Sequence, residues 1–284
     1  MKESKIKINV ITKVVISLGI VLATSFFILF LIGKFNSIPV NTQQPEKNLK
    51  EVSPKKVNEA SPKNVNEASP KKQERPDGKP VGKVVYLTFD DGPTTLTSQF
   101  LEVLKEQNIK ATFFMIGSNL QNTNYQESVK RAVIEGHYIG AHSMSHNSVK
   151  LYKKGQFVPE MKEALALIHD ITGTNPKLVR PPYGSAPGLK SKEIRNQIAE
   201  SEIKVWDWTI DSRDWELKDN PYQIIENVKK QTTDDIEVVL MHEKPQTLQA
   251  LPEIIKFYKE QGYEFGVYND ANHFYLNFQK DNRL

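Results

Sequence analysis

The stretch Val84-Val85-Tyr86-Leu87-Thr88-Phe89-Asp90-Asp91-Gly92-Pro93 joins a run of β-branched and aromatic residues to two adjacent carboxylates and a turn. The apolar run predicts a buried β-strand that ends at the aspartates. An Asp-Asp-Gly-Pro sequence alone is more typical of a turn. Because these carboxylates follow directly on a buried strand and a histidine pair, His142 and His146, occurs elsewhere, we interpret them as part of a functional site.

Short apolar runs and amphipathic segments alternate from about residue 80 onward, which predicts parallel strands joined by right-handed helical crossovers. The expected strands are Val84–Phe89, Ala111–Ile116, His137–Ala141, Leu178–Val179, Lys204–Ile210, Glu237–Met241 and Glu264–Tyr268. The expected helices lie near Leu96–Gln107, Gln126–Glu135, Phe157–Thr172, Ser191–Ser201, Tyr222–Gln231 and Leu248–Gln261. Seven strands suit either an open doubly wound sheet or an incomplete βα barrel. The sequence has no glycine-rich motif for nucleotide phosphates.

The residues with catalytic chemistry fall at the carboxyl ends of the expected strands, the edge where βα barrels build active sites. His142-Ser143-Met144-Ser145-His146 supplies two imidazoles four residues apart. One carboxylate and two neutral imidazoles give a metal three protein ligands and leave a coordination position for water. The second carboxylate of Asp90-Asp91 can then accept a proton from that water, so the sequence indicates a hydrolytic metal site.

Composition restricts the function further. The 284-residue chain has no cysteine, which excludes disulfides, thiolate metal sites and cysteine nucleophiles. Its formal net charge of +4 comes from the amino-terminal part: residues 1–13 carry +3 and residues 34–79 carry +4, which leaves −3 for residues 80–284. A mildly acidic domain lacks the basic surface of a nucleic-acid binder, so we expect no nucleic-acid partner.

The amino-terminal part predicts a membrane tether. Residues 1–13 form a basic segment, and the apolar run at residues 14–32 is long enough to cross a bilayer of about 30 Å. Residues 33–79 contain Pro, Ser, Lys and Glu in a short tandem repeat, and we expect a disordered linker. Lysines before the span predict that residues 80–284 lie outside the cytoplasm. The alternative is a cleaved secretory signal and a secreted protein.

Five fragments, in order, give the domain a family resemblance over about residues 80–270. They are Thr88-Phe89-Asp90-Asp91-Gly92, His142-x-x-x-His146, Arg180-Pro181-Pro182-Tyr183-Gly184, Asp214-Trp215 and Leu240-Met241-His242. This set resembles the polysaccharide deacetylases, the NodB-like domains of carbohydrate esterase family 4. The resemblance implies a distorted, incomplete (β/α)7 barrel of parallel strands that removes acetyl groups from a polysaccharide with the help of a divalent metal.

The resemblance also assigns roles to residues. Asp91, His142 and His146 would hold the metal, which in this family is usually zinc, although cobalt and nickel also suit such ligands. Asp90 would be the base that accepts the proton of the water, and Arg180 would hold and tune that carboxylate.

Further roles concern the acetyl group and the leaving amine. The backbone N–H of Tyr183 would stabilise the oxyanion. His242 would be the acid that protonates the amine, oriented by Asp214. The residues expected to contact the substrate are Trp215, Leu240, Pro182 and Tyr183.

Other polar residues receive no catalytic role. His137, His169 and His273 are interpreted as packing or surface residues, and Asp207 and Asp211 as supporting or surface residues. Two residues depart from the family pattern: Asn147 stands where proline is common, and Glu243 stands where aspartate is common.

The function expected from this pattern is release of acetate from a cell-wall glycan, with N-acetylglucosamine of peptidoglycan as the substrate and a monomer as the active form. Two alternatives stay open. The first is a wall-glycan-binding module on the same fold that has lost catalysis. The second is a deacetylase of chitin oligomers, an exopolysaccharide or a xylan ester.

Overall fold

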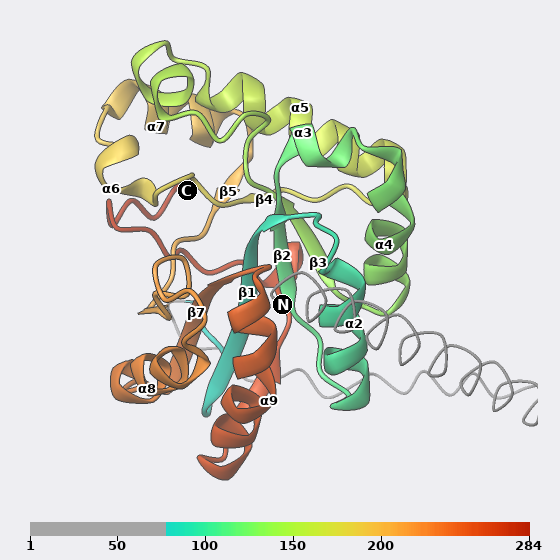
Figure 1. The fold of residues 1–284 in the computed structure, drawn as a ribbon. Coiled ribbons are helices and arrows are strands. Elements are labelled where there is room, and N and C mark those ends of the chain that lie inside the picture. The colour runs from blue at the N-terminus through green and yellow to red at the C-terminus, as the bar shows by residue number, and fades with distance from the viewer. Residues whose placement is uncertain (1–77) are drawn as a thin grey trace, which may run out of the picture. The chain divides into compact units, whose positions relative to one another are not determined.

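Strand β1 (Val84–Gly92) lies in the middle of a sheet whose strands all run parallel (Figure 1). The computed structural model describes residues 78–284. Seven strands follow the order β5-β4-β3-β2-β1-β7-β6, and β8 pairs with β1 beside this path. Residues Val84–Tyr86 of β1 pair with β8, whereas Thr88–Gly92 pair with β2. The edge strands β5 and β6 share no pairing within residues 78–284, so the curled sheet is an incomplete barrel.

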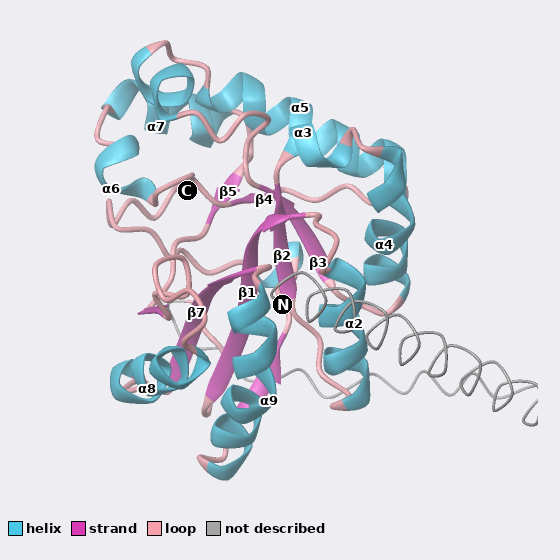
Figure 2. Ribbon diagram, viewed as in Figure 1, coloured by secondary structure: helices cyan, strands magenta, loops and turns pink. Residues whose placement is uncertain are grey.

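The remaining strands are β2 (Thr112–Met115), β3 (Tyr138–Ala141), β4 (Leu178–Val179), β5 (Lys204–Val205), β6 (Ile210–Asp211), β7 (Ile236–His242) and β8 (Glu264–Gly266). The helices are α2 (Thr97–Glu106), α3 (Gly117–Leu120), α4 (Thr123–Ile134), α5 (Phe157–Thr172), α6 (Ser185–Gly188), α7 (Lys192–Glu200), α8 (Pro221–Gln231) and α9 (Pro245–Glu260). Two short helical turns are η1 (Val149–Lys153) and η2 (Asp270–Asn272). Figure 2 shows that the long helices lie around the outside of the curled sheet.

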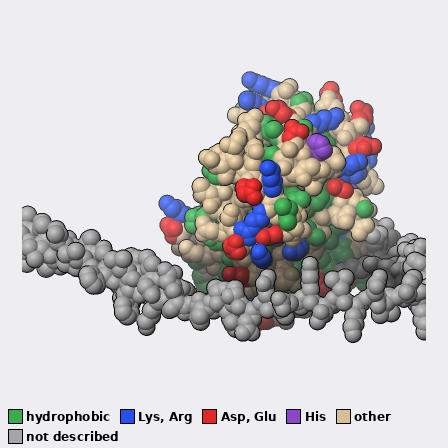
Figure 3. All heavy atoms as spheres, turned by 90° about the vertical axis from the view of Figure 1, so that its right-hand side faces the viewer, with side chains coloured by type: hydrophobic (Ala, Val, Ile, Leu, Met, Phe, Trp, Pro, Cys, Tyr) green, Lys and Arg blue, Asp and Glu red, His purple; other side chains and the backbone are tan. Residues whose placement is uncertain are grey.

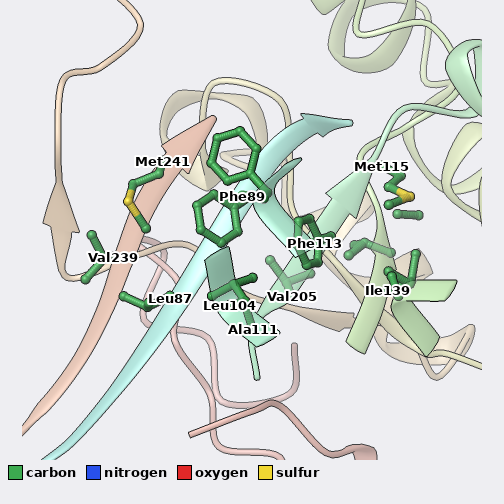
Figure 4. Packing of buried hydrophobic residues seen from close by; sticks show 14 of the residues in the cluster. Leu87, Phe89, Leu104, Ala111, Phe113, Met115, Ile139, Val205, Val239 and Met241 are labelled. Carbon is green, nitrogen blue, oxygen red and sulfur yellow. The ribbon is translucent and has the colours of Figure 1, made fainter. Parts of the chain in front are cut away.

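Both faces of β1 are buried, which explains its nearly continuous apolar sequence. Val85, Leu87 and Phe89 face the helices and belong to the large core, part of which Figure 4 shows. Val84 and Tyr86 face the opposite side and pack in a smaller cluster with Trp206. Because strand residues alternate between faces, Thr88 and Asp90 continue the inner row above that cluster. The alternation of β1 therefore directs Asp90 into the barrel.

The predicted incomplete barrel of parallel strands is confirmed, and α5 has the predicted bounds. The single strand expected at Lys204–Ile210 is wrong. It is two short strands at opposite edges of the sheet, β5 beside β4 and β6 beside β7. Between them the chain crosses the barrel, and its backbone N–H groups bond to changing partners: Trp206 N to Val179 O, and Thr209 N to Val238 O.

The predicted basic segment, transmembrane span and most of the linker lie outside the described residues. Among residues 78–284, no helix combines the length and apolar character that a membrane span needs. On the face of the domain shown in Figure 3, basic and acidic side chains lie interspersed.

Candidate active site

Asp90 and Asp91 reach the same cavity because β1 contains a bulge. The pairing with β2 runs from Asp90–Phe114 directly to Gly92–Met115, so Asp91 is an extra residue. Its φ of +68° is unusual for a residue with a side chain. Adjacent residues of a regular strand point to opposite faces, and a bulge changes the direction of one of them. Asn119 of α3 supports the bulge by donating from Nδ2 to Asp91 O at 3.0 Å.

Arg180 follows β4, and its guanidinium is fully buried inside the barrel. Nη1 donates to Asp90 Oδ1 at 2.9 Å and to Thr88 Oγ1 at 2.6 Å. Nε donates to Trp206 O at 3.1 Å, and Nη2 donates to Asp207 O at 2.7 Å. Such a planar, multiply bonded group fixes a carboxylate more rigidly than a flexible lysine would. Asp90 Oδ1 is therefore committed to Arg180, and Oδ2 faces the metal-ligand candidates.

His142 and His146 lie in the loop after β3, and this loop is not helical. Ser143 and His146 have positive φ angles of 64° and 50°. Ser143 Oγ accepts from His146 N at 2.9 Å and so stabilises the tight turn between the imidazoles. Side chains bonded to nearby backbone commonly replace helical hydrogen bonds in such turns.

The three predicted metal ligands converge. Asp91 Oδ1 lies 3.7 Å from His142 Nε2 and 3.5 Å from His146 Nε2. It is also buried and has no hydrogen-bond partner among the described residues. His142 Nδ1 lies 2.7 Å from Arg180 O, which can only accept, so Nδ1 carries the proton and Nε2 offers a lone pair. Within residues 78–284 this is the one group of three such side chains close enough to hold a metal.

The protonation states also suit metal binding. Burial lowers the pKa of His142 and outweighs the opposing effect of Asp90 and Asp91. Burial alone would raise the pKa of Asp91, but its electrostatic interactions with the imidazoles of His142, His242 and His146 and with the Lys244 ammonium outweigh burial and lower that pKa. A neutral imidazole and an ionised carboxylate are the forms that bind divalent cations.

His242 ends β7, next to Asp90 in the sheet register. Its Nδ1 donates to Asp214 Oδ1 at 2.7 Å, while Asp214 Oδ2 accepts from His242 N at 2.6 Å and from Thr247 Oγ1 at 2.5 Å. Burial lowers the pKa of His242, but the hydrogen bond and charge of Asp214, with the charges of Asp90 and Asp91, reverse this and raise the pKa above its usual value. In this pair, Asp214 stabilises the protonated form of the His242 imidazole.

These groups open into one cavity of about 420 Å³ at the carboxyl ends of the strands. It is lined by Asp90, Asp91, His142, His146, Pro181, Tyr183, Trp208, Asp211, Trp215, Leu240 and His242. Pro182 is not part of this lining, because it is buried and its carbonyl accepts from Tyr152 OH at 2.6 Å. Pro181 and Tyr183 face the cavity from that turn instead. A second cavity of about 300 Å³ near Val84 and Glu264, at the amino ends of β1 and β8, contains none of the predicted site residues.

The residues that received no catalytic role lie elsewhere, except Asp211, which lines the cavity. His137 Nδ1 accepts from Ala111 N, and burial lowers its pKa to about 4. His169 is exposed on α5. Burial also lowers the pKa of His273 to about 4. Asn147 Oδ1 accepts from Lys150 N at the start of η1.

Glu243, the other departure from the family pattern, connects the end of β7 to the loop that follows β1. Its Oε2 accepts from Thr94 N at 3.1 Å and from the hydroxyls of Thr94 and Thr97 at 2.7 and 2.5 Å. The side chain also occupies the space beside Gly92, where a Cβ would lie 2.2 Å from Glu243 Oε1. Glu243 therefore helps to position the aspartate pair.

Sequence reasoning missed Glu160, a buried residue of α5. Its carboxylate accepts from Ser145 N at 2.9 Å and from the Ser145 hydroxyl, and so holds the loop next to His146. The one available signal was an acidic residue on the otherwise apolar face of an amphipathic helix.

Replacing Glu160 by glutamine is expected to weaken binding of a divalent metal, measured with Zn²⁺ as the probe, about 10- to 100-fold, the usual effect of losing a partner that orients a metal ligand. A competition titration with a chromophoric chelator measures this change. The control is Glu163→Gln, an exposed position on the same helix. Equal zinc affinity of the two variants would contradict the role of Glu160.

One cleft of an incomplete βα barrel holds a carboxylate, a group of three metal-ligand candidates and an imidazole bonded to a second carboxylate, and this combination is typical of a metal-dependent hydrolase. The family described as "Polysaccharide deacetylase" matches residues 77–206. A peptidoglycan-N-acetylglucosamine deacetylase of Bacillus cereus is 51% identical over 71% of this chain and 75% of its own length. The chain belongs to the polysaccharide deacetylase family.

Solved structures agree. The polysaccharide deacetylase Bc1974 from Bacillus cereus has 50% sequence identity and a TM-score of 0.69, covering 71% of this chain and all of that one. A CE4 esterase of Streptococcus mutans has 31% identity and a TM-score of 0.61, covering 66% of this chain and 86% of that one. The expected alternative of a non-catalytic binding module is thereby set aside: the chain is a polysaccharide deacetylase, a hydrolase.

Proposed function

We propose that this hydrolase removes the N-acetyl group from N-acetylglucosamine in peptidoglycan, releasing acetate and a free amine. The observation that carries the proposal is the convergence of Asp90, the Asp91–His142–His146 group and His242 on one cavity. Support for the substrate comes from the Bacillus cereus relative, whose name states that activity and which shares half of the aligned residues. Other relatives include a bifunctional xylanase/deacetylase at 33% identity, so xylan esters form the comparison substrate.

Asp91, His142 and His146 fit a divalent metal and are proposed to hold zinc, with cobalt or nickel as substitutes. The fit rests on the unpartnered, buried Asp91 Oδ1 and on the fixed tautomer of His142. When bound, such a metal lowers the pKa of a coordinated water towards about 7 and polarises the acetyl carbonyl.

Asp90 is proposed as the general base. Arg180 holds its Oδ1, and its Oδ2 lies 3.7 Å from His142 Nε2, beside the ligand group. From this position Oδ2 accepts the proton of the water that attacks the acetyl carbon. The bond that forms is from water oxygen to acetyl carbon, and the bond that breaks is the amide C–N bond.

The turn after β4 and the wall of the cavity are proposed to hold the acetyl group. No acceptor among the described residues takes the backbone N–H of Tyr183, which leaves it available for the developing oxyanion. Trp215 has 55% of its surface exposed, and Leu240 lies in the same cavity lining. These two side chains provide apolar contact for the acetyl methyl group.

His242 is proposed to give a proton to the leaving amine. Its Nδ1 is engaged with Asp214, so Nε2 is the atom available for transfer. A general acid works only while it is protonated, and Asp214 raises the pKa at which His242 loses its proton.

Replacing Asp214 by asparagine is expected to lower the pKa of His242, because the hydrogen-bonded negative charge is lost. Activity is present below the pKa of the acid and declines above it, so the alkaline decline of kcat/KM moves to lower pH. Well above that pH the variant is expected to be about 10²-fold slower or more. A pH–rate profile measures the shift, with the exposed Asp170→Asn as control; identical alkaline limbs for both variants would refute the assignment.

The activity is tested with full-length protein loaded with Zn²⁺ and purified peptidoglycan. We expect stoichiometric acetate in solution and glucosamine in the digested glycan by mass spectrometry. Acetylated xylan and a chitin oligomer are assayed in parallel, and faster release from xylan would replace the proposed substrate by an ester. If the metallated protein releases acetate from none of the three, the proposal fails.

We also propose that residues 14–32 anchor the enzyme in the cell membrane with the catalytic domain outside. The sequence supports this through the length of the apolar run and the lysines before it. Protease added to intact cells is expected to degrade the catalytic domain and leave a short membrane-bound fragment. Recovery of all the enzyme from the medium, with an amino terminus that lies after residue 32, would establish a cleaved signal instead.

A further inference from the structure

Asp207 is fully buried in the segment that crosses from β5 to β6, although the proposed reaction gives it no chemical step. Its Oδ1 accepts from Ser185 N at 2.8 Å. Its Oδ2 accepts from the hydroxyl of Ser185 and from Phe278 N, the latter at 2.7 Å. A carboxylate with three donors makes strong, directional bonds. Asp207 therefore joins the crossing segment to the turn after β4 and to the carboxyl-terminal segment.

The turn that Asp207 holds is the one that presents Tyr183. Two consecutive residues, Tyr183 and Gly184, have positive φ angles of 65° and 80°. A residue with a side chain keeps such a conformation only where its surroundings over-determine it. Gly184 N donates to Pro181 O at 2.9 Å, which closes the turn. The side chain of Asp207 then fixes the exit of the turn at Ser185.

The carboxyl-terminal segment takes part in the same arrangement. Besides the bond from Phe278 N, Gln279 Nε2 donates to Ser185 O at 2.9 Å. The Phe278 ring packs edge-to-face on Trp208, with centroids 5.0 Å apart, and Trp208 lines the catalytic cavity. Figure 1 shows the carboxyl terminus near α6, the short helix that begins at Ser185. The turn is thus held by the crossing segment and by the carboxyl-terminal segment, and the Asp207 side chain bonds to both the turn and the carboxyl-terminal segment.

We propose that Asp207 is a positioning residue for the oxyanion donor. It holds the Pro181–Ser185 turn so that the Tyr183 N–H meets the acetyl oxygen as that oxygen gains charge, and the carboxyl-terminal segment supports it. The inference rests on the proposed function, since it concerns the donor of that reaction. An oxyanion donor acts on the transition state more than on the bound substrate, so its misplacement reduces kcat and leaves KM nearly unchanged.

The test compares Asp207→Asn with Glu237→Gln in the full-length, zinc-loaded protein. Glu237 is a matched control, because it is buried and also accepts three donors: Thr233 N and Asp234 N, each at 2.9 Å, and the Thr209 hydroxyl. It lies near the start of β7, at the opposite end of the strand from His242. An amide cannot accept from all three donors, so both variants should unfold at lower temperature.

Steady-state kinetics on penta-N-acetylchitopentaose, normalised to zinc content and folded fraction, separate the two positions. We expect Asp207→Asn to lower kcat by up to about 10²- to 10³-fold, the range seen when an oxyanion donor is lost, with little change in KM. Glu237→Gln should keep the parental kcat. Ser185→Ala, which removes the hydroxyl and keeps the Ser185 N–H bond, should lower kcat less than Asp207→Asn does, and it serves as the test variant if Asp207→Asn does not fold.

Each result decides the matter. An unchanged kcat in the folded Asp207→Asn variant overturns the positioning role. If Asp207→Asn does not fold, an unchanged kcat in Ser185→Ala has the same consequence. An equal loss of kcat in Glu237→Gln also overturns it. These outcomes leave the proposed function intact, because the parent is active in the same assay. A zinc-loaded parent that releases no acetate from the oligomer or from peptidoglycan overturns the proposed function, and the positioning role with it.

Discussion

Replacing His146 by alanine is expected to abolish tight zinc binding and to reduce kcat/KM by at least about 10³-fold, because a metal in such a site contributes several kcal/mol of transition-state stabilisation at 1.36 kcal/mol per tenfold. His146 is the most suitable ligand to remove. Its side chain is partly exposed, whereas His142 is buried and also donates to Arg180 O. Loss of His146 should therefore leave the barrel intact and affect the metal site selectively.

The measurement combines zinc content after dialysis with acetate release from peptidoglycan. The matched control is His169→Ala, since His169 is an exposed histidine on α5 whose Nδ1 bonds only locally, to Thr174 O. Chelator treatment of the parent should reproduce the loss, and added Zn²⁺ should restore activity to the parent but not to His146→Ala. Full activity of a zinc-free His146→Ala protein would show that the ligand assignment is mistaken.

Replacing Asp90 by asparagine is expected to lower kcat by about 10²- to 10⁴-fold, the usual contribution of a general base. Asparagine keeps an oxygen for the Arg180 hydrogen bond and removes the acceptor at Oδ2. Zinc content and KM should change little, because Asp91, His142 and His146 are untouched. The variant should also be less stable, since breaking a buried ion pair commonly costs about 3–5 kcal/mol. Rates are therefore expressed per folded, zinc-loaded molecule.

Asp211→Asn is the control for this experiment. Asp211 lines the same cavity, but its Oδ1 accepts from Arg213 N, and it belongs neither to the metal-ligand group nor to the Asp214–His242 pair. Its replacement should change kcat only slightly. A folded Asp90→Asn variant with parental kcat would remove Asp90 from the role of base and would require another acceptor for the proton of the water.

Much of the fold follows from local patterns. The apolar runs of β1 and β7 and the amphipathic pattern of α5 predict these elements because each one buries a face whose period can be counted along the chain. The pattern fails at Lys204–Ile210. Alternating apolar residues there predict one strand. In the structure, the first part of the segment pairs with β4 and the last part with β7, because the two edges of the open barrel lie at these strands. That information is not local.

The sequence alone predicted which residues would carry the chemistry, because only certain side chains bind metals or move protons and they occur in ordered motifs after predicted strands. The tertiary structure decided how they meet. The bulge at Asp91 brings two adjacent carboxylates, which a regular strand would point apart, into one cavity. The tertiary structure also buries Asp207 and Glu160, neither of which has a motif in the sequence. Their carboxylates bond to the turns that carry Tyr183 and His146. The physical reason is that hydrogen bonds between distant segments depend on packing in three dimensions, which a linear pattern does not contain.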